Sequence, residues 1–441
     1  MNQQAQELNS VIKEFNPHIY DMLSSMGKNL FFPKGILSQS AEAREKADKI
    51  NATIGIAKEN GKVMSLPSIA QSVNGIEPDD FLTYAPSFGV LELRKAWRNA
   101  LYTKNPSLEN KKITLPVVTS GVTHAVSTFA DLWIDPGDTV ILPDMMWGNY
   151  NMTFSVRNRA KISHYRTFIP DLSGLDLDSF EKAVKKEAAA GDKIITVLNF
   201  PHNPSGYSIS KDEGKRIANI LIDIAKNGTN VVVACDDAYF GLFYEDDTMK
   251  ESLFSLLAGA DKRIVAVKLD GATKEDYVWG LRTGFVTYGF CADRGVEELH
   301  EAVEKKTAGC IRGCVSNASH LSQSIILQSM NNKKYLEFKQ EKFDLLKARA
   351  FAIKDIVYNE TFREAWDVYP FNSGYFMCIR LKDVNAEDLR VHLLEKYGTG
   401  LISIGEENLR IAFSCLEKSD VKVLFDTILK GINELKLKIE N

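Results

Sequence analysis

A lysine and an arginine stand eight residues apart in the stretch 270–284, which reads DGATKEDYVWGLRTG. Lys274 follows an apolar run over 263–269 that predicts a buried strand, so we expect its amine in the loop at the carboxyl end of that strand. Ligands bind at this edge of α/β sheets. An amine among apolar and cationic neighbours loses part of its preference for the ammonium form and can attack a carbonyl to form a Schiff base. Arg282 could bind a phosphate through its planar fork.

This pair alone is weak evidence, because most lysines in glycine-containing loops are solvated surface residues. A second lysine, Lys268, competes for the role of nucleophile. It lies within the predicted strand, and the residue eight positions beyond it is Asp276 rather than an arginine. Lys274 is therefore the preferred nucleophile.

Two further polar stretches follow predicted buried strands. Residues 199–206 read NFPHNPSG, in which two X-Pro units restrict the backbone and present the amide of Asn203 to a ligand. The sequence CDDAY puts Asp236 and Tyr239 at the end of the next strand. Each stretch also has a purely structural interpretation, the first as a rigid turn and the second as an N-capping acid followed by a core tyrosine.

A short stretch of small residues lies between a predicted strand over 115–118 and a helix that begins near residue 122. Backbone N–H groups at a helix N-terminus, with small side chains that allow close approach, form an anion site. A Ser-Gly turn is common, so this signal has low specificity by itself. The stretch consists of Ser120, Gly121, Val122 and Thr123.

Composition excludes several classes of protein. The chain has 441 residues, of which 44% are hydrophobic and 25% charged, enough for a large core and about two or three domains. A formal net charge of −4 gives no global electrostatic reason to bind nucleic acid or an anionic membrane. No stretch reaches the roughly 18 apolar residues of a membrane span, and the polar start lacks an apolar signal core, so we expect a cytoplasmic protein. The six cysteines lack paired CxxC spacing, and Cys310 with Cys314 supplies only two ligands, so we expect no metal.

Helical and strand-like segments alternate from about residue 88. Continuous Val/Ile/Leu strands between helices predict an α/β fold with a mostly parallel sheet covered on both faces. A charged helix, a strand over 374–380 and an amphipathic terminal helix indicate a smaller α+β domain. We predict a large domain over 66–320 and a small one from 1–65 and 321–441. The expected strands are 139–142, 194–198, 230–234, 264–269 and 284–290, and the expected helices include 122–133, 175–186, 212–226 and 335–357.

The order SGVT, NFPHNPSG, DDAY, and a lysine with an arginine eight residues later, resembles the class I and II aminotransferases, the fold type I enzymes that use pyridoxal 5′-phosphate. The resemblance covers nearly the full chain, and the ordered set of motifs is more specific than any one of them. It implies a large domain with a sheet of the seven-stranded type, ping-pong transfer of an amino group between an amino acid and a 2-oxo acid, and a homodimer with shared active sites.

The resemblance also implies roles around the cofactor ring. Lys274 would carry the cofactor as a Schiff base and move the substrate α-proton. Asp236 would keep the ring nitrogen protonated, which makes the ring an electron sink. Asn203 and Tyr239 would hydrogen-bond to the phenolic oxygen. Trp147 would stack on the ring, although a core tryptophan fits the sequence equally well.

The cofactor phosphate would be held by Arg282 and by the amides that follow Ser120, with Tyr84 reaching it from the partner subunit. The chain departs from the family at position 271, where many members have a serine and this chain has Gly271. The phosphate should therefore depend more on Arg282 and on backbone amides than in typical relatives. Tyr277 and Thr283 are also unusual at their positions.

For the substrate, the resemblance implies that Arg410 binds the α-carboxylate bidentately, with Gly55, Asn203 and Trp147 nearby. The segment IRGCVSN is similar to the one that, in the aspartate and aromatic branch, lends an arginine to the distal carboxylate across the dimer. Arg312 would then favour aspartate, glutamate or 2-oxoglutarate, with aromatic amino acids as further donors. The residues after this segment differ from the prolines usual in that branch, so the alternative that Arg312 is an ordinary surface residue stays open.

Two other functions stay open at this point. A lyase or decarboxylase can use the same scaffold, because the pocket selects which substrate bond is broken. A regulator that binds the cofactor without turnover would need a DNA-reading domain, and the N-terminal region has no room for a separate helix-turn-helix.

Overall fold

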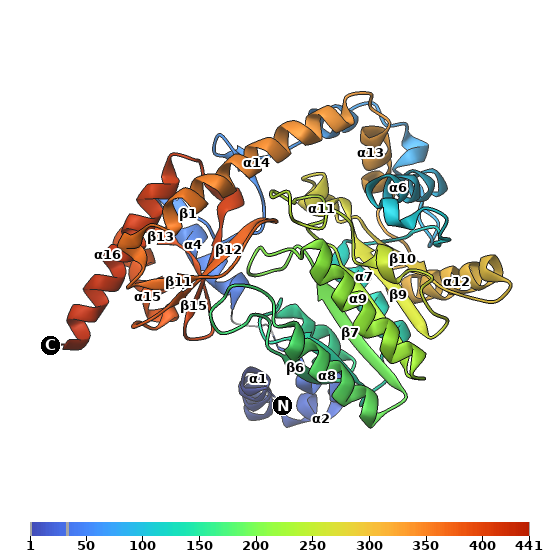
Figure 1. Cartoon of the computed structure of the whole chain (residues 1–441), viewed down its shortest axis with the longest axis horizontal. Helices are drawn as coiled ribbons and strands as arrows, with labels where there is room; N and C mark the ends of the chain where they lie inside the picture. The colour runs from blue at the N-terminus through green and yellow to red at the C-terminus, as the bar shows by residue number, and fades with distance from the viewer. Residues whose placement is uncertain (1, 32–34, 441) are drawn as a thin grey trace.

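A seven-stranded sheet forms the centre of the larger part of the molecule (Figure 1). The structure is a computed structural model that describes residues 2–31 and 35–440. One strand, β10, runs antiparallel to both of its neighbours, and the other neighbouring pairs are parallel. The predicted mostly parallel sheet is therefore confirmed. In spatial order the strands are β4 (Val117–Thr119), β10 (Gly284–Gly289), β9 (Ile264–Asp270), β8 (Asn230–Asp236), β7 (Lys193–Asn199), β5 (Thr139–Pro143) and β6 (Lys161–Tyr165).

Helices cover both faces of this sheet, and β8 shows why its strands are apolar throughout. Val232 belongs to the core beneath α7 (Val122–Trp133). Its neighbour Val233 belongs to the core on the opposite face, beneath α8 (Leu177–Ala190) and α9 (Lys211–Lys226). Because successive side chains point to opposite faces, a strand covered on both sides is a continuous apolar run. The same alternation sends adjacent residues at the end of β8 in opposite directions.

Helices of various lengths complete the larger part. The first turn of α9 begins with a capping box between Ser210 and Glu213, which satisfies two N–H groups that would otherwise lack partners. The other helices of this region are α5 (Pro67–Ser72), α6 (Leu91–Lys104), α10 (Phe254–Leu257), α11 (Ala272–Glu275), α12 (Val296–Cys314) and α13 (His320–Met330).

A second sheet of four antiparallel strands forms the smaller part, and α14 (Tyr335–Val357) runs from one part to the other (Figure 1). Segments from early and late in the sequence meet here, because β1 (Ile50–Asn51) pairs with β13 (Thr399–Gly400). The domain boundaries at residues 66 and 320 stay a prediction. The sheet contains β11 (Trp366–Val368), β12 (Phe376–Leu381), β15 (Asn408–Ala412) and β14 (Ile402–Ile404), and packs beside α15 (Ala386–Tyr397) and α16 (Asp420–Glu440).

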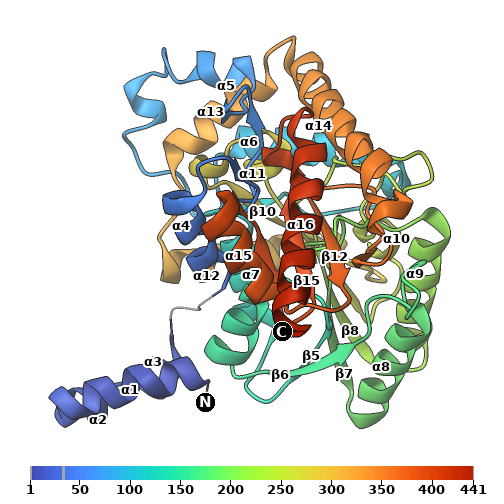
Figure 2. The ribbon, with the colours of Figure 1, turned by 90° about the vertical axis from the view of Figure 1, so that its left-hand side faces the viewer.

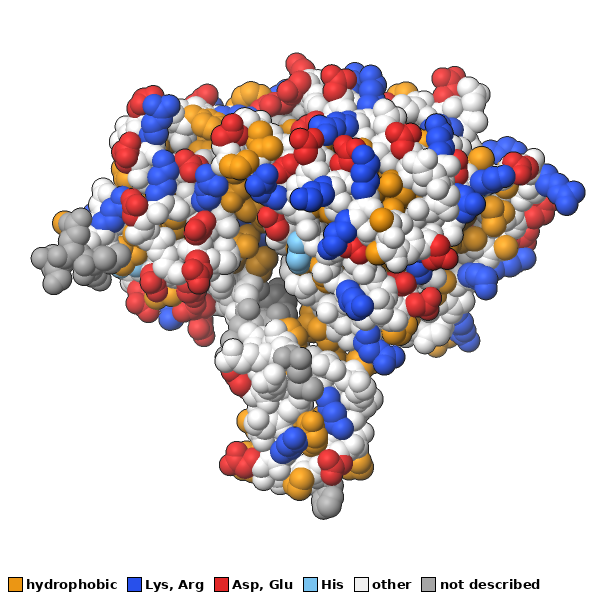
Figure 3. Space-filling view, turned by 60° about the horizontal axis from the view of Figure 1, so that its bottom comes forward, with side chains coloured by type: hydrophobic (Ala, Val, Ile, Leu, Met, Phe, Trp, Pro, Cys, Tyr) orange, Lys and Arg blue, Asp and Glu red, His pale blue; other side chains and the backbone are white. Residues whose placement is uncertain are grey.

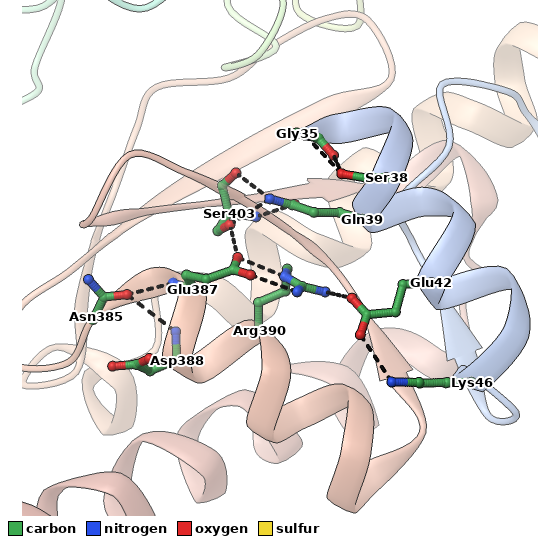
Figure 4. A network of polar contacts seen from close by, with 10 residues as sticks. All are labelled: Gly35, Ser38, Gln39, Glu42, Lys46, Asn385, Glu387, Asp388, Arg390 and Ser403. Carbon is green, nitrogen blue, oxygen red and sulfur yellow. Dashed lines mark hydrogen bonds and ion pairs between the residues drawn. The ribbon is translucent and has the colours of Figure 1, made fainter. Parts of the chain in front are cut away.

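Polar contacts fasten α4 (Ile36–Lys46) to this smaller part (Figure 4). The Arg390 guanidinium pairs with Glu42 at 3.0 Å and with Glu387 at 2.7 Å. The amide side chain of Gln39 exchanges hydrogen bonds with Ser403. Since Arg390 is buried, loss of either carboxylate would leave a poorly paired charge.

The first helices lie apart from both sheets. In Figure 2, α1 (Gln3–Phe15), α2 (Pro17–Met22) and α3 (Ser25–Asn29) form a projection from the body of the molecule. Large apolar side chains are exposed on this projection, including Phe15 at 80% and Met22 at 77% of their full exposure.

Charges of both signs are intermixed on the face drawn in Figure 3, which therefore offers no extended basic surface to a nucleic acid. Within the described ranges, no helix combines the length and apolar character of a membrane span. Among the same residues, no group of three or more His, Cys, Asp or Glu side chains is placed to hold a metal ion.

Candidate active site

A cavity of about 90 Å³ lies at the carboxyl ends of β7, β8 and β9, beside the start of α7. Parallel strands bring these ends to one edge, which is where the separate sequence motifs meet. Most of the residues predicted to bind a cofactor ring are in its wall. The lining consists of Val122, Thr123, Trp147, Asn199, Asn203, Asp236, Ala238, Tyr239 and Lys274.

Lys274 lies in this wall, but the prediction that it occupies a loop is wrong. It is the third residue of the short helix α11, which starts directly after β9. Its ammonium nitrogen lies 4.8 Å from the centre of the Tyr239 ring. Burial lowers the pKa of the Lys274 ammonium to about 8. The nearby Asp236 carboxylate opposes this shift, and the positive charge of Arg282 adds to it. The amine is therefore partly neutral at moderately alkaline pH.

Lys268, the competing lysine, is held elsewhere. It is fully buried and forms ion pairs with Asp237 and, at 3.7 Å, with Asp270. Burial alone would lower the pKa of Lys268, but these two carboxylates outweigh burial and raise it. Lys268 thus stays an ammonium ion and is absent from the cavity wall. The preference for Lys274 now has a physical reason.

Asp236 and Asp237 separate at the end of β8. Asp236 lines the cavity, whereas Asp237 pairs with Lys268 and accepts a hydrogen bond from Ser252 at 2.5 Å. Burial raises the pKa of the Asp236 carboxyl, opposed by a hydrogen bond from Tyr150 and by the charge of Lys274. The two acids of the DDAY motif therefore belong to different faces of the sheet.

Tyr150 is a residue of the site that sequence reasoning missed. Its hydroxyl donates to Asp236 Oδ2 at 2.5 Å, across 86 positions of sequence. Tyr150 stands three positions after Trp147, and the two rings form a T-shaped contact with their centres 5.5 Å apart and their planes inclined by 81°. Its position three residues after Trp147 was the only sign in the sequence that Tyr150 lies near the site, and this position does not indicate a contact with Asp236.

Asn203 and Arg410 connect the two parts of the molecule. Arg410 in β15 donates to Asn203 Oδ1 at 3.2 Å and to the carbonyl of Thr53 at 3.0 Å. Its guanidinium carbon lies 4.2 Å from the centre of the Phe376 ring. Burial lowers the pKa of Arg410, and its Nε is buried without a hydrogen-bond partner among the described residues. A buried guanidinium with a free donor is suited to bind a carboxylate.

Gly55 lies beside this arginine pocket. A Cβ atom at position 55 would lie 3.1 Å from the Phe376 ring and 3.6 Å from the Tyr239 hydroxyl oxygen. Even a methyl group here would crowd the space between the two aromatic rings. Gly55 thus lies beside Phe376, the ring over which the Arg410 guanidinium stacks, and its contact with a substrate stays a prediction.

The predicted phosphate residues form a crowded turn. Gly121 has φ +82°, and a Cβ there would lie 2.5 Å from Arg282 Nη2. The N–H groups of Ser120 and Gly121 already donate to His124 and to the Thr119 carbonyl. The free donors are therefore those of Val122 and Thr123, which open α7 and have no intrahelical partner.

The departure at Gly271 has a steric cause. A Cβ at this position would lie 2.6 Å from the Thr283 carbonyl oxygen and 2.9 Å from the Gly284 Cα. The backbone after Arg282 thus occupies the space that a serine side chain would need. The buried hydroxyl of Thr273 has no hydrogen-bond partner in the described part of the chain and is a candidate replacement donor.

Tyr84 and Arg312 are exposed side chains outside the cavity wall of their own chain. Tyr84 is 90% exposed. Arg312 is exposed near the end of α12, and its guanidinium donates to Ser316 Oγ at 2.6 Å. Neither residue lines the cavity.

The donor set fits pyridoxal 5′-phosphate. The amine of Lys274, with its lowered pKa, is suited to react with the aldehyde, and the buried carboxylate of Asp236 is suited to pair with the protonated ring nitrogen. The free N–H groups of Val122 and Thr123, with Arg282, match the phosphate. Each chemical group of the cofactor thus has a complementary group at this edge of the sheet.

Comparisons with known proteins agree with this chemistry. The family model of aminotransferase class I and II matches residues 47–428. The chain is 24% identical over 371 residues to a probable N-acetyl-LL-diaminopimelate aminotransferase of Bacillus subtilis, covering 81% of this chain and 82% of the relative. It is 23% identical over 367 residues to an aspartate aminotransferase of Sulfurisphaera tokodaii, with 81% and 82% covered.

Solved structures share the fold. An aminotransferase from Anaerococcus prevotii superposes with a TM-score of 0.81 at 22% identity, over 92% of this chain and 98% of that one. The aspartate aminotransferase of Thermus thermophilus with maleate superposes with a TM-score of 0.72 at 16% identity, over 93% and 99%. The expectation of a fold type I architecture is thereby confirmed.

Proposed function

Because this chain belongs to the class I and II aminotransferases, enzymes that use pyridoxal 5′-phosphate, we propose that it transfers the amino group of a dicarboxylic or aromatic amino acid to a 2-oxo acid such as 2-oxoglutarate. The observation that carries the proposal is one constellation of charges. Lys274 and Asp236 line a single cavity together with Asn203, and Asn203 is bonded to the buried Arg410.

The residues of the chain have distinct tasks in this proposal. When bound, the cofactor supplies an electrophilic carbon and an electron-withdrawing ring. Lys274 Nζ would hold the cofactor, and once the incoming amino acid has displaced it, the free amine would accept the α-proton of the amino acid. The Asp236 carboxylate would hold the proton on the ring nitrogen. Asn203 and Tyr239 would donate hydrogen bonds at the ring edge, and Trp147 would stack on the ring.

Recognition of the substrate α-carboxylate falls to Arg410. Its Nε has no partner in the described residues, and its Nη atoms are already anchored on Asn203 and Thr53. The guanidinium plane is therefore held in place before a substrate arrives, which reduces the entropy lost on binding. The phosphate of the cofactor would be held by Arg282 and by the N–H groups of Val122 and Thr123, which line the cavity at the start of α7.

We further propose a homodimer in which Tyr84 and Arg312 complete the site of the partner. Both side chains are exposed in the single chain, although the resemblance assigns them to a binding site. Mixing a variant that cannot hold the cofactor with one that has lost the distal cation tests this arrangement. If Arg312 acts across the interface, a hybrid of Lys274→Ala and Arg312→Ala chains contains one fully native site and regains dicarboxylate activity. If it acts within its own chain, no native site forms and activity stays low.

A panel of amino donors against 2-oxoglutarate tests the substrate proposal, with the wild type, Arg312→Ala and the exposed control Arg294→Ala. The expected result in Arg312→Ala is a fall in kcat/KM for aspartate, glutamate and 2-oxoglutarate, because each distal carboxylate loses its cation. The kcat/KM for aromatic donors, which in a ping-pong reaction reports the donor half-reaction alone, should stay near the wild-type value. Equal activity of all three proteins with dicarboxylates would refute the distal clamp. Release of ammonia or carbon dioxide without amino transfer would indicate a lyase or decarboxylase instead.

A further inference from the structure

The hydrogen bond between Tyr150 and Asp236 lies entirely inside the protein. Tyr150 is 2% exposed, and so is Asp236. The hydroxyl approaches Oδ2 at 2.5 Å, and the backbone N–H of Ala238 approaches Oδ1 at 3.2 Å. A carboxylate has about four acceptor positions. These two bonds fix its plane and leave acceptor positions on both oxygens for a further donor from the cavity.

The Tyr150 ring is held from two sides. The Phe154 ring stacks on it with centres 5.5 Å apart and planes inclined by 16°, and Trp147 meets it edge-on. Tyr150 directly precedes the π-helix η3 (Asn151–Arg157). π-Helical turns occur frequently at functional sites. The hydroxyl thus has little freedom to turn away from Asp236.

We propose that Tyr150 is a positioning residue that keeps the Asp236 carboxylate ionised and oriented toward the cofactor ring nitrogen. This inference rests on the proposed function, in which Asp236 binds that nitrogen. A hydrogen bond donated to a carboxylate favours its charged form, which burial otherwise disfavours. Burial and the neighbouring carboxylate also raise the pKa of the Tyr150 phenol well above its ordinary range, so the phenol remains a donor at every working pH.

The remaining titratable neighbours of this carboxylate act in both directions. Lys274, from α11, favours the ionised form of Asp236 by its positive charge. Asp237, the next residue of the chain, disfavours it. Tyr239, whose own pKa burial raises, stays neutral. Among these four neighbouring side chains, Tyr150 is the one that donates a hydrogen bond to Asp236.

The test compares Tyr150→Phe with Tyr288→Phe. Both changes remove a buried tyrosine hydroxyl, but Tyr288 bonds to Thr307 at 3.0 Å, away from the cavity wall. Equilibrium dialysis of each apoenzyme with pyridoxal 5′-phosphate from pH 5 to pH 9 gives the dissociation constant and its pH midpoint. Loss of a hydrogen bond to a charged carboxylate should shift the pKa of that carboxyl, and so the pH midpoint of cofactor binding, by about one unit or more.

We expect Tyr150→Phe to bind the cofactor about tenfold more weakly near neutral pH, with the acidic midpoint moved upward by about one unit. The Tyr288→Phe protein should keep both wild-type values. In an Asp236→Ala background, Tyr150→Phe should change cofactor affinity no further, because the two side chains act as one unit.

Two results would overturn the inference. If Tyr150→Phe keeps the wild-type affinity and pH midpoint, or if its effect adds to that of Asp236→Ala in the double variant, the tyrosine does not act through Asp236. The proposed function would stay intact in either case, provided that the wild type transfers amino groups. A wild-type protein that neither binds the cofactor nor transfers amino groups would remove both together.

Discussion

Replacement of Arg410 by lysine tests the substrate pocket because it keeps the charge and removes the fork. Two N–H groups of the guanidinium form the anchoring bonds, and the unpaired Nε–H with the remaining Nη–H groups can form a planar pair of bonds to a carboxylate, which an ammonium group cannot reproduce. Loss of one charge-assisted bond to the substrate costs about 1.5–3 kcal/mol, which corresponds to a fall of about 10- to 200-fold in kcat/KM.

The assay measures kcat/KM for several amino donors with saturating 2-oxoglutarate. Arg349→Lys is the matched control, since Arg349 is also buried and also bonds to one carbonyl, that of Ser414, and to Glu417. Both variants should lose stability in urea. The fall in kcat/KM should be confined to Arg410→Lys and should affect all donors alike, because every amino acid has an α-carboxylate.

A fall of less than about fivefold would refute the assignment of Arg410 to the α-carboxylate, since that is below the cost of one charge-assisted bond. A loss restricted to aspartate and glutamate would also contradict it, because it would place Arg410 at the distal carboxylate.

Three further predictions follow from the packing and charges of the site. Gly121→Ala should weaken cofactor binding at least about tenfold in equilibrium dialysis, because the added methyl group displaces Arg282 and φ +82° disfavours alanine; unchanged affinity would contradict the phosphate turn. Lys268→Met should lower the free energy of unfolding by about 3–5 kcal/mol in urea, because it leaves Asp237 buried without its cation; a loss below about 1 kcal/mol would show that the pair is unimportant. In the apoenzyme, folding lowers the pKa of the Lys274 ammonium from 10.5 to about 8. Between these two pH values the unfolded chain binds more protons than the folded chain, so the free energy of unfolding should rise with pH. Lys274→Met should abolish this rise, and an equal rise in both proteins would refute the lowered pKa.

Patterns within one segment were predictable from the sequence. The helices over 122–133 and 335–357 have the predicted bounds, because their apolar stripes and ends are encoded locally. The strands beside the cavity were found as continuous apolar runs, which a doubly covered sheet requires. In contrast, β6 reads KISHY and is half-exposed, so it lacks the apolar run by which the other strands were found.

Relations between distant segments were not predictable. The contact of Tyr150 with Asp236 depends on how β8 and the segment before η3 meet, and no local pattern encodes it. The short helix that holds Lys274 has four residues, too few for a periodic signal. At Gly271, the sequence showed the missing hydroxyl but not its cause, which is the backbone of Thr283 and Gly284.

Lys274 is the lysine that should carry the cofactor. Reduction of the holoenzyme with borohydride, followed by proteolysis and mass spectrometry of the peptides, identifies the modified residue. We expect a single pyridoxyl group on Lys274, lost when an amino donor is added before reduction. A pyridoxyl group on Lys268 or another lysine, with Lys274 unmodified, would contradict it.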